Sequence, residues 1–125
     1  MIEKIIGKTL ESFSMSKDIY HGSDIILLNF TDGSKLKMWH GQDCCEDVYI
    51  ESITGDFERL IGNPILVAEK RESDIIEHDD EHDELWTFYC IRNVKESVDI
   101  RWYGTSNGYY SISISEHFKE SKNEI

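Results

Sequence analysis

The chain has 125 residues, with 25 acidic against 13 basic side chains and a formal net charge of -12. This length is typical of a single domain spanning 1–125 with one core. The acidic balance argues against direct binding to DNA or RNA, because phosphate backbones are recognised by basic surfaces. The sequence has neither a long apolar run nor the pattern of a signal peptide, so we expect a cytoplasmic protein without a membrane partner.

Apolar residues alternate with polar ones over much of the chain, which is typical of β-strands. Thr31-Asp32-Gly33-Ser34 lies between two such segments and predicts a tight hairpin. Asp56 is a candidate N-cap for one helical turn at 57–61, which Gly62 closes. In this part of the chain the expected strands are 8–15, 25–30, 35–40, 48–53 and 65–70.

An acidic segment follows, with eight carboxylates between Glu72 and Glu84. We predict an exposed loop at about 72–84. It also contains His78 and His82, which could form a pH- or metal-sensitive pair. In so dense a run of charge, solvated side chains are the simpler expectation.

The last part of the chain predicts a three-stranded meander. Its expected strands are 85–92, 97–104 and 109–115. A four-residue loop between the first two sets Ile91 opposite Val98, and a three-residue loop ending at Gly108 sets Trp102 opposite Ile112. One face of the meander then belongs to the core. The fold we expect is mainly β (α+β at most), an antiparallel sheet rolled into a half-barrel or small barrel with one short helix.

The other face of this meander combines aromatic rings with a guanidinium and gives the leading candidates for ligand binding. The candidate residues are Trp86, Phe88, Arg101 and Tyr103, with Asn107 and Tyr109 at the following loop. Such a face can stack a flat base while the arginine neutralises a phosphate. Alternatively, the same face packs against the rest of a rolled sheet or against a partner subunit.

The stretch from His40 to Glu46 is a second candidate site. It reads His40-Gly41-Gln42-Asp43-Cys44-Cys45-Glu46, and we take His40, Gln42, Asp43 and Glu46 as secondary candidates for ligand binding. A zinc site normally has a second pair of ligands at similar spacing, which is missing here. A polar turn with reduced cysteine thiols is the simpler expectation. We therefore expect no metal, no other cofactor and no catalytic residue.

Several motifs resemble those of an uncharacterised family of small bacteriophage and prophage proteins. These motifs are Gly7-Lys8-Thr9, the His40 to Glu46 stretch, Gly55-Asp56 with Leu60-Ile61-Gly62, Trp86-Thr87-Phe88-Tyr89, and Arg101-Trp102 with Ser106-Asn107-Gly108-Tyr109-Tyr110. The resemblance implies a phage-related origin and brings no activity, substrate or cofactor with it. A small acidic phage protein fits an accessory or counter-defence role.

Three hypotheses follow for the function. The first is a binding protein that sequesters a small nucleotide-derived immune signal on the aromatic face, with a homo-oligomer as one arrangement of the site. The second is an acidic protein-protein inhibitor that mimics nucleic acid and blocks a host defence nuclease or regulator. The third is a metal-binding protein or enzyme centred on the His40 to Glu46 stretch.

Overall fold

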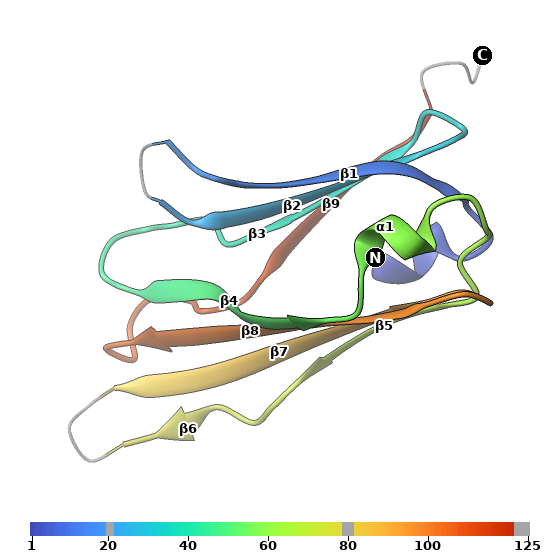
Figure 1. The fold of residues 1–125 in the computed structure, drawn as a ribbon. Helices are drawn as coiled ribbons and strands as arrows, with labels where there is room; N and C mark the ends of the chain where they lie inside the picture. Colours follow the sequence, from blue (N-terminus) through green and yellow to red (C-terminus); the bar gives the residue numbers. More distant parts are fainter. Residues whose placement is uncertain (20–21, 79–81, 122–125) are drawn as a thin grey trace.

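Two antiparallel sheets face each other in the computed structural model, which describes residues 1–19, 22–78 and 82–121 (Figure 1). The first sheet has the strand order β1-β2-β3-β9, and the second has the order β4-β8-β7-β5, with β6 also beside β7. The strands of the first sheet are β1 (Leu10–Lys17), β2 (Asp24–Phe30), β3 (Lys35–Trp39) and β9 (Ser115–Lys119). Those of the second sheet are β4 (Asp47–Thr54), β5 (Val67–Glu72), β6 (Ile76–Glu77), β7 (Asp83–Arg92) and β8 (Ser97–Ser106).

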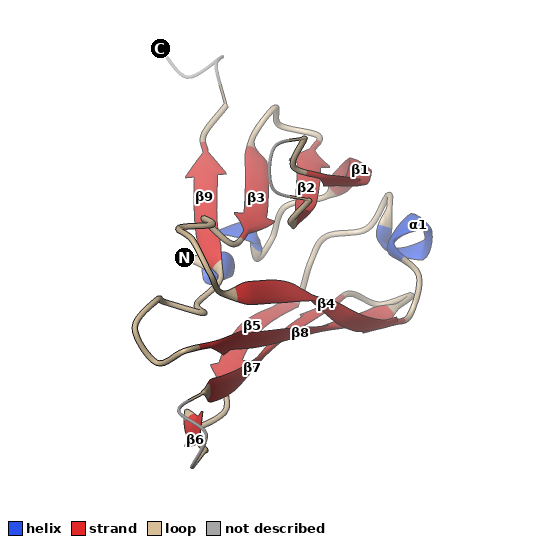
Figure 2. Cartoon of the chain, turned by 90° about the vertical axis from the view of Figure 1, so that its left-hand side faces the viewer, coloured by secondary structure: helices blue, strands red, loops and turns tan. Residues whose placement is uncertain are grey.

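Two short helical segments lie at one end of the sheets, the 3-10 helix η1 (Ile2–Ile5) and the α-helix α1 (Phe57–Leu60) (Figures 1 and 2). The prediction of a mainly β, antiparallel fold with one short α-helix is confirmed for the described residues. In residues 1–19, 22–78 and 82–121 the strands form two separate sheets and no closed barrel. Within the described ranges, no helix has the length and apolar character needed to cross a membrane.

The core fills the space between the sheets, because alternate residues of each strand point inward. The first sheet contributes Leu10, Ile26, Leu28, Phe30, Leu36 and Met38, and the second contributes Leu85, Tyr89, Ile91, Val98, Ile100 and Trp102. A polar contact also joins the sheets within this core. The Tyr89 hydroxyl on β7 donates to Glu116 Oε2 on β9 over 3.0 Å.

The local signals in the first part of the chain are confirmed. The hairpin between β2 and β3 turns at Gly33, whose φ of 87° favours glycine. The Asp32 carboxylate accepts a hydrogen bond from the Ser34 amide at 2.9 Å and stabilises this turn. At the start of α1, the Asp56 carboxylate accepts from the Glu58 amide at 2.9 Å, as expected of an N-cap.

The predicted register of the central hairpin is also confirmed. Ile91 lies opposite Val98, and Tyr89 lies opposite Ile100. The buried Asn93 holds this loop with side-chain hydrogen bonds. Its Oδ1 accepts from the amides of Lys95 and Glu96, and its Nδ2 donates to the Leu60 carbonyl at 2.9 Å. The loop between β7 and β8 is thereby tied to the end of α1.

The prediction of a third meander strand at 109–115 is wrong. The described chain leaves β8 after Ser106 and next forms a strand as β9, which pairs with β3 in the other sheet. Ile112 is nevertheless buried, and it passes so close to β8 that a Cβ added at Gly104 would lie 2.9 Å from the Ile112 Cβ atom. The apolar alternation therefore predicted burial correctly, but the segment crosses between the sheets instead of pairing with β8.

The acidic segment predicted as an exposed loop is mostly exposed, and parts of it form strands. β5 continues to Glu72, and β6 pairs with the first residues of β7, with Ile76 opposite Glu84. β5 and β6 together make an interrupted edge strand along β7. The carboxylates at 79–81 lie outside the described residues. The segment thus belongs to the edge of the second sheet.

Candidate functional site

The outward face of the β7–β8 pair brings together four of the predicted site residues. Alternation along both strands places Trp86, Phe88, Arg101 and Tyr103 on the side away from the core. Trp86 lies opposite Tyr103 across the ladder, and Phe88 lies opposite Arg101. All four side chains retain contact with solvent, so this face is open in the single chain.

The rings and the guanidinium of this face contact one another. The Trp86 and Tyr103 ring centroids are 5.1 Å apart, and Tyr49 on β4 extends the row at 5.6 Å from Tyr103. The Arg101 guanidinium carbon lies 6.0 Å from the Trp86 centroid and 5.9 Å from the Phe88 centroid. These distances are at the outer limit of cation–π attraction, so the contacts position Arg101 more than they stabilise it.

Arg101 also forms an ion pair with Glu51. The register of β4 against β8 shifts between Ile50 and Ser52, which leaves Glu51 at a bulge. Its Oε1 lies 2.9 Å from Arg101 Nε, and the two side chains are 35% and 48% exposed. Because so exposed a pair contributes little to stability, the guanidinium can exchange this carboxylate for another anion at small cost.

A shallow depression of about 560 Å³ lies over this face and extends toward β5. Phe88 and Arg101 line it together with Arg71 and Arg92, while Trp86 and Tyr103 lie beside it. Glu69 and Asp99 contribute carboxylates to the same lining. With three guanidiniums against two carboxylates, the lining carries a small local excess of positive charge, which favours an anionic ligand.

Sequence reasoning missed Arg71 and Arg92 as members of this face. Arg71 lies opposite Phe88 because β5 pairs with β7. Arg92 was predicted as a strand residue, and its outward position follows from the same alternation that places Phe88 there. That signal was available for Arg92, whereas nothing in the local pattern revealed β5 as the neighbour of β7.

Asn107 and Tyr109 are not part of this cluster. The Asn107 side chain accepts a hydrogen bond from the Tyr109 amide at 3.0 Å, and the Ser106 hydroxyl accepts from the Gly108 amide at 3.1 Å. These bonds shape the turn that follows β8. The Tyr109 ring is 82% exposed and lines a different shallow depression, together with His78 and Asp83.

Tyr103 connects the aromatic face to the acidic edge of the sheet. Its hydroxyl donates to Glu84 Oε2, and the other oxygen of that carboxylate contacts His78 Nε2. Burial, and then the hydrogen bond to Glu84, raise the pKa of Tyr103 to about 12. The same hydrogen bond, followed by that with His78, lowers the pKa of Glu84.

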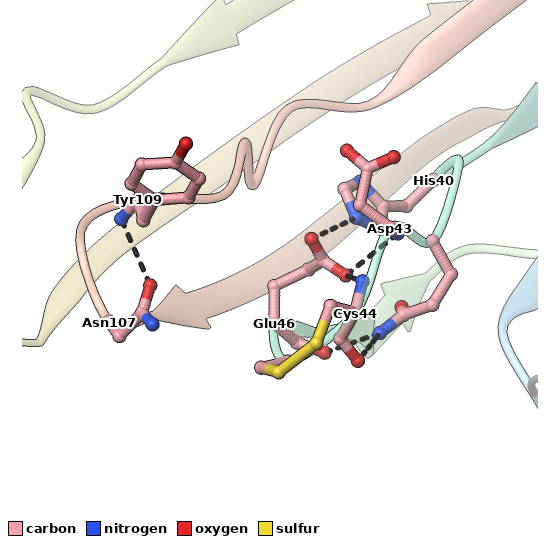
Figure 3. The surroundings of a disulfide bond; sticks show 8 residues. His40, Asp43, Cys44, Glu46, Asn107 and Tyr109 are labelled. Carbon is pink, nitrogen blue, oxygen red and sulfur yellow. Dashed lines mark hydrogen bonds and ion pairs between the residues drawn. A yellow bond between two sulfur atoms is a disulfide. The ribbon is translucent and has the colours of Figure 1, made fainter.

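The His40 to Glu46 stretch forms a compact turn whose polar groups are largely used within the protein (Figure 3). Glu46 Oε1 accepts from the Asp43 and Cys44 amides at 2.9 and 3.0 Å, and Gln42 Nε2 donates to the Glu46 carbonyl at 2.7 Å. Burial raises the pKa of Glu46, but these backbone donors, with the nearby His40, outweigh it and lower the pKa overall. The turn therefore fits a structural role.

His40 itself is buried and joins this turn to the crossing segment. Its Nδ1 donates to the Ser113 carbonyl at 2.7 Å, while Nε2 lies 3.9 Å from Glu46 Oε2. Within the part of the chain that the structure describes, neither His40 Nε2 nor Glu46 Oε2 has a hydrogen-bond partner. His40 thus connects the turn before β4 to the segment before β9.

The expectation of reduced cysteines is wrong for the adjacent pair, since Cys44 and Cys45 form a disulfide (Figure 3). Each sulfur is bonded to the other, so neither is a thiolate available to a metal or a substrate in this structure. Cys90 on β7 is a free cysteine that lines the depression over the outward face.

The fold and its outward face define a small antiparallel β protein with two sheets, one of which presents aromatic rings and guanidiniums to solvent. The chain belongs to the family described as Domain of unknown function (DUF7448), whose sequence model matches residues 3–115. This confirms the expected membership in an uncharacterised family. No curated protein matches the chain, and no solved structure matches it.

Proposed function

We propose that this protein binds a small nucleotide-derived ligand on the outward face of β7 and β8. One observation carries the proposal, namely that Trp86, Phe88 and Tyr103 share one solvent-accessible face with Arg101. Base-sized rings stack on such side chains, at roughly 1–3 kcal/mol per base. A guanidinium supplies the charge-assisted hydrogen bonds that a phosphate needs.

The depression beside these rings supports a small ligand over a long nucleic acid. Its three arginines, Arg71, Arg92 and Arg101, are a local cluster within a chain of net charge -12. Such a cluster suits one or two phosphates, whereas a nucleic-acid backbone needs an extended basic footprint. The ligand class we favour is therefore a mononucleotide, a cyclic dinucleotide or a cyclised ADP-ribose derivative.

The biological part of the proposal is sequestration of an immune signal by a phage-related counter-defence protein in the bacterial cytoplasm. It rests on the resemblance of the sequence motifs to phage proteins and on a site with stacking and phosphate-binding groups. A protein that withdraws a signal from solution needs affinity for it and no further chemistry. This part is tested by growth of infected, defence-active cells with and without the protein.

Binding is tested by calorimetric titration of the full chain with cyclic dinucleotides and cyclised ADP-ribose derivatives. Arg101→Ala should weaken binding by about ten- to a hundredfold, because a hydrogen bond to a charged group contributes roughly 1.5–3 kcal/mol. Glu51→Gln should strengthen it, since the carboxylate that competes for Arg101 is removed. The matched control is Arg59→Ala, which removes a guanidinium that is 68% exposed and lies on α1.

The proposal fails if no nucleotide binds the parent chain, or if Arg59→Ala weakens binding as much as Arg101→Ala. Native mass spectrometry of protein from infected cells adds a second measurement, because it reports bound metabolite and subunit number together. A dimer whose interface covers Trp86 and Phe88 would assign this face to packing instead. The acidic inhibitor and the site at His40 to Glu46 stay predictions, and a host nuclease retained by the protein would favour the inhibitor.

A further inference from the structure

Where β6 ends and β7 begins, the described chain brings together three side chains that lie outside the depression near Arg101, namely His78, His82 and Glu84. β6 pairs with the start of β7, with Glu77 opposite Asp83 and Ile76 opposite Glu84. The His78 amide donates to the His82 carbonyl at 3.0 Å and continues the pairing beyond Glu77 and Asp83. This pairing brings two histidines that are four positions apart to the same end of the sheet, next to Glu84.

The three side chains meet at this end. The His78 and His82 rings are stacked, with centroids 4.2 Å apart and planes 14° from parallel. His78 Nε2 contacts Glu84 Oε1. One ligand atom from each of the three side chains lies within 4.8 Å of the other two. Two imidazole nitrogens and one carboxylate oxygen therefore converge on one small volume.

Tyr103 holds the carboxylate in this arrangement. Its hydroxyl donates to Glu84 Oε2, which leaves Oε1 directed toward His78. The Tyr103 ring is itself positioned between Trp86 and Tyr49, at 5.1 and 5.6 Å between centroids. Hydrogen bonds of this kind commonly orient the carboxylate ligands of metal sites.

We propose that His78, His82 and Glu84 bind one divalent transition-metal ion, with zinc as the favoured ion. Two histidines and one glutamate are a known ligand set of zinc centres that keep a fourth position open. Tetrahedral zinc with bonds of about 2.0 Å places neighbouring ligand atoms about 3.3 Å apart. The three ligand atoms now lie within 4.8 Å of one another, so zinc binding requires them to move closer; His78 is exposed, while His82 and Glu84 are partly buried.

This site differs from the earlier zinc candidate at His40, Cys44 and Cys45, where the sulfurs are bonded to each other. It also changes the interpretation of His78 and His82, which the sequence alone favoured as solvated side chains. Their stacking and the contact with Glu84 are consequences of strand pairing. The site does not depend on the nucleotide proposal, because none of its three ligands lines the depression near Arg101.

The test is calorimetric titration of the chelator-treated, oxidised full chain with zinc chloride. We expect one zinc ion per chain, and a dissociation constant at least about 100-fold higher for His78→Ala and for His82→Ala. Tyr103→Phe should raise it by about tenfold, since it removes only the group that orients Glu84. His117→Ala is the matched control, because it removes an exposed imidazole on β9 and should leave the constant within about twofold.

Two further measurements separate loss of the site from loss of the fold. Thermal melts of each variant identify any that unfold, and Glu84→Gln provides a ligand change that keeps the size of the side chain. Ring resonances of His78 and His82 should shift with zinc in NMR spectra, while those of His117 stay in place. The proposal is overturned if the parent chain binds no stoichiometric zinc, or if His78→Ala binds zinc as tightly as His117→Ala.

Discussion

The two faces of the β7–β8 pair have similar aromatic content and opposite surroundings. On the inner face, Tyr89 and Trp102 are each 1% exposed and lie within the core between the sheets. On the outer face, Trp86 and Phe88 are partly exposed, and Arg101 lies over both rings. Tertiary packing covers the first pair of rings fully and the second pair only in part. Large rings are therefore informative about binding only when the structure leaves part of their surface accessible to solvent.

The same contrast appears in the polar contacts of the two faces. The inner Tyr89 hydroxyl bonds a glutamate that is 7% exposed, and burial, then Glu116, raises the pKa of this tyrosine. The outer Arg101 bonds a glutamate that is 35% exposed. A buried polar contact costs more to break than an exposed one, because water cannot replace the lost partner. Mutations on the two faces should accordingly differ in how much they lower the free energy of unfolding.

The largest effect is expected from a pair of matched tryptophan truncations. Trp102→Ala should lower the free energy of unfolding by about 3–5 kcal/mol, as for other large-to-small changes in a core. Trp86→Ala should lower it by roughly 1–2 kcal/mol, since less apolar area is removed from a half-buried ring. Urea unfolding of both variants measures the difference. Equal losses would mean that the outer face is also packed, either as a second core or against another subunit.

A smaller effect is expected from the polar contact that joins the sheets. Tyr89→Phe removes the hydroxyl that donates to Glu116, and should cost about 1.5–3 kcal/mol because the acceptor is a buried charge. Tyr109→Phe, at a ring that is 82% exposed, is the control and should stay within about 0.5 kcal/mol. Chemical denaturation of both variants measures the two losses in the free energy of unfolding. A loss confined to Tyr109→Phe would contradict the inner position of Tyr89.

The smallest effect should come from the exposed contact between Lys8 and Asp32, at the β2–β3 turn of the first sheet. Lys8 and then Ser34 lower the pKa of Asp32 to about 2, below its ordinary value of 3.8. Because the folded pKa is depressed, this contribution to stability is present above about pH 4 and is lost as the pH falls toward 2. Asp32→Asn should thus cost less than about 1 kcal/mol at pH 7, since the contact is exposed.

Unfolding curves of the parent and Asp32→Asn between pH 7 and pH 2 measure this difference, which should shrink toward the acid end. A difference that grew below pH 4 would show that the carboxylate is stabilising in its protonated form instead. A cost of several kcal/mol at pH 7 would contradict the rule that exposed polar contacts contribute little here.

Local sequence signals predicted much of the fold because they depend on neighbours along the chain. The Asp-Gly pair placed the β2–β3 hairpin, and Asp56 capped α1 as expected. Each confirmed strand begins and ends within two residues of its prediction. The register of β7 against β8 followed from one short loop, which is why the two faces of this pair were separated correctly.

The failed prediction of a third meander strand involves a partner that is distant in sequence. The alternation around Ile112 and Ile114 is satisfied by any arrangement that buries them, so it did not distinguish pairing with β8 from crossing to the other sheet. The adjacent cysteines failed for a different reason. Three cysteines, two of them adjacent, and an expected reducing compartment favoured free thiols, whereas the turn joins Cys44 and Cys45 in a disulfide. Residue spacing does not specify which strand a segment pairs with or whether two cysteines form a disulfide.

The sequence by itself determined that the chain is mainly β and that Trp86, Phe88, Arg101 and Tyr103 share one face, because side-chain direction alternates with a period of two. Only the tertiary structure decided what surrounds that face. Pairing of β5 with β7 brought in Arg71, and pairing of β6 with β7 brought His78 to Glu84. These pairings depend on which strand edges remain open as the sheets assemble, and no local periodicity encodes that choice.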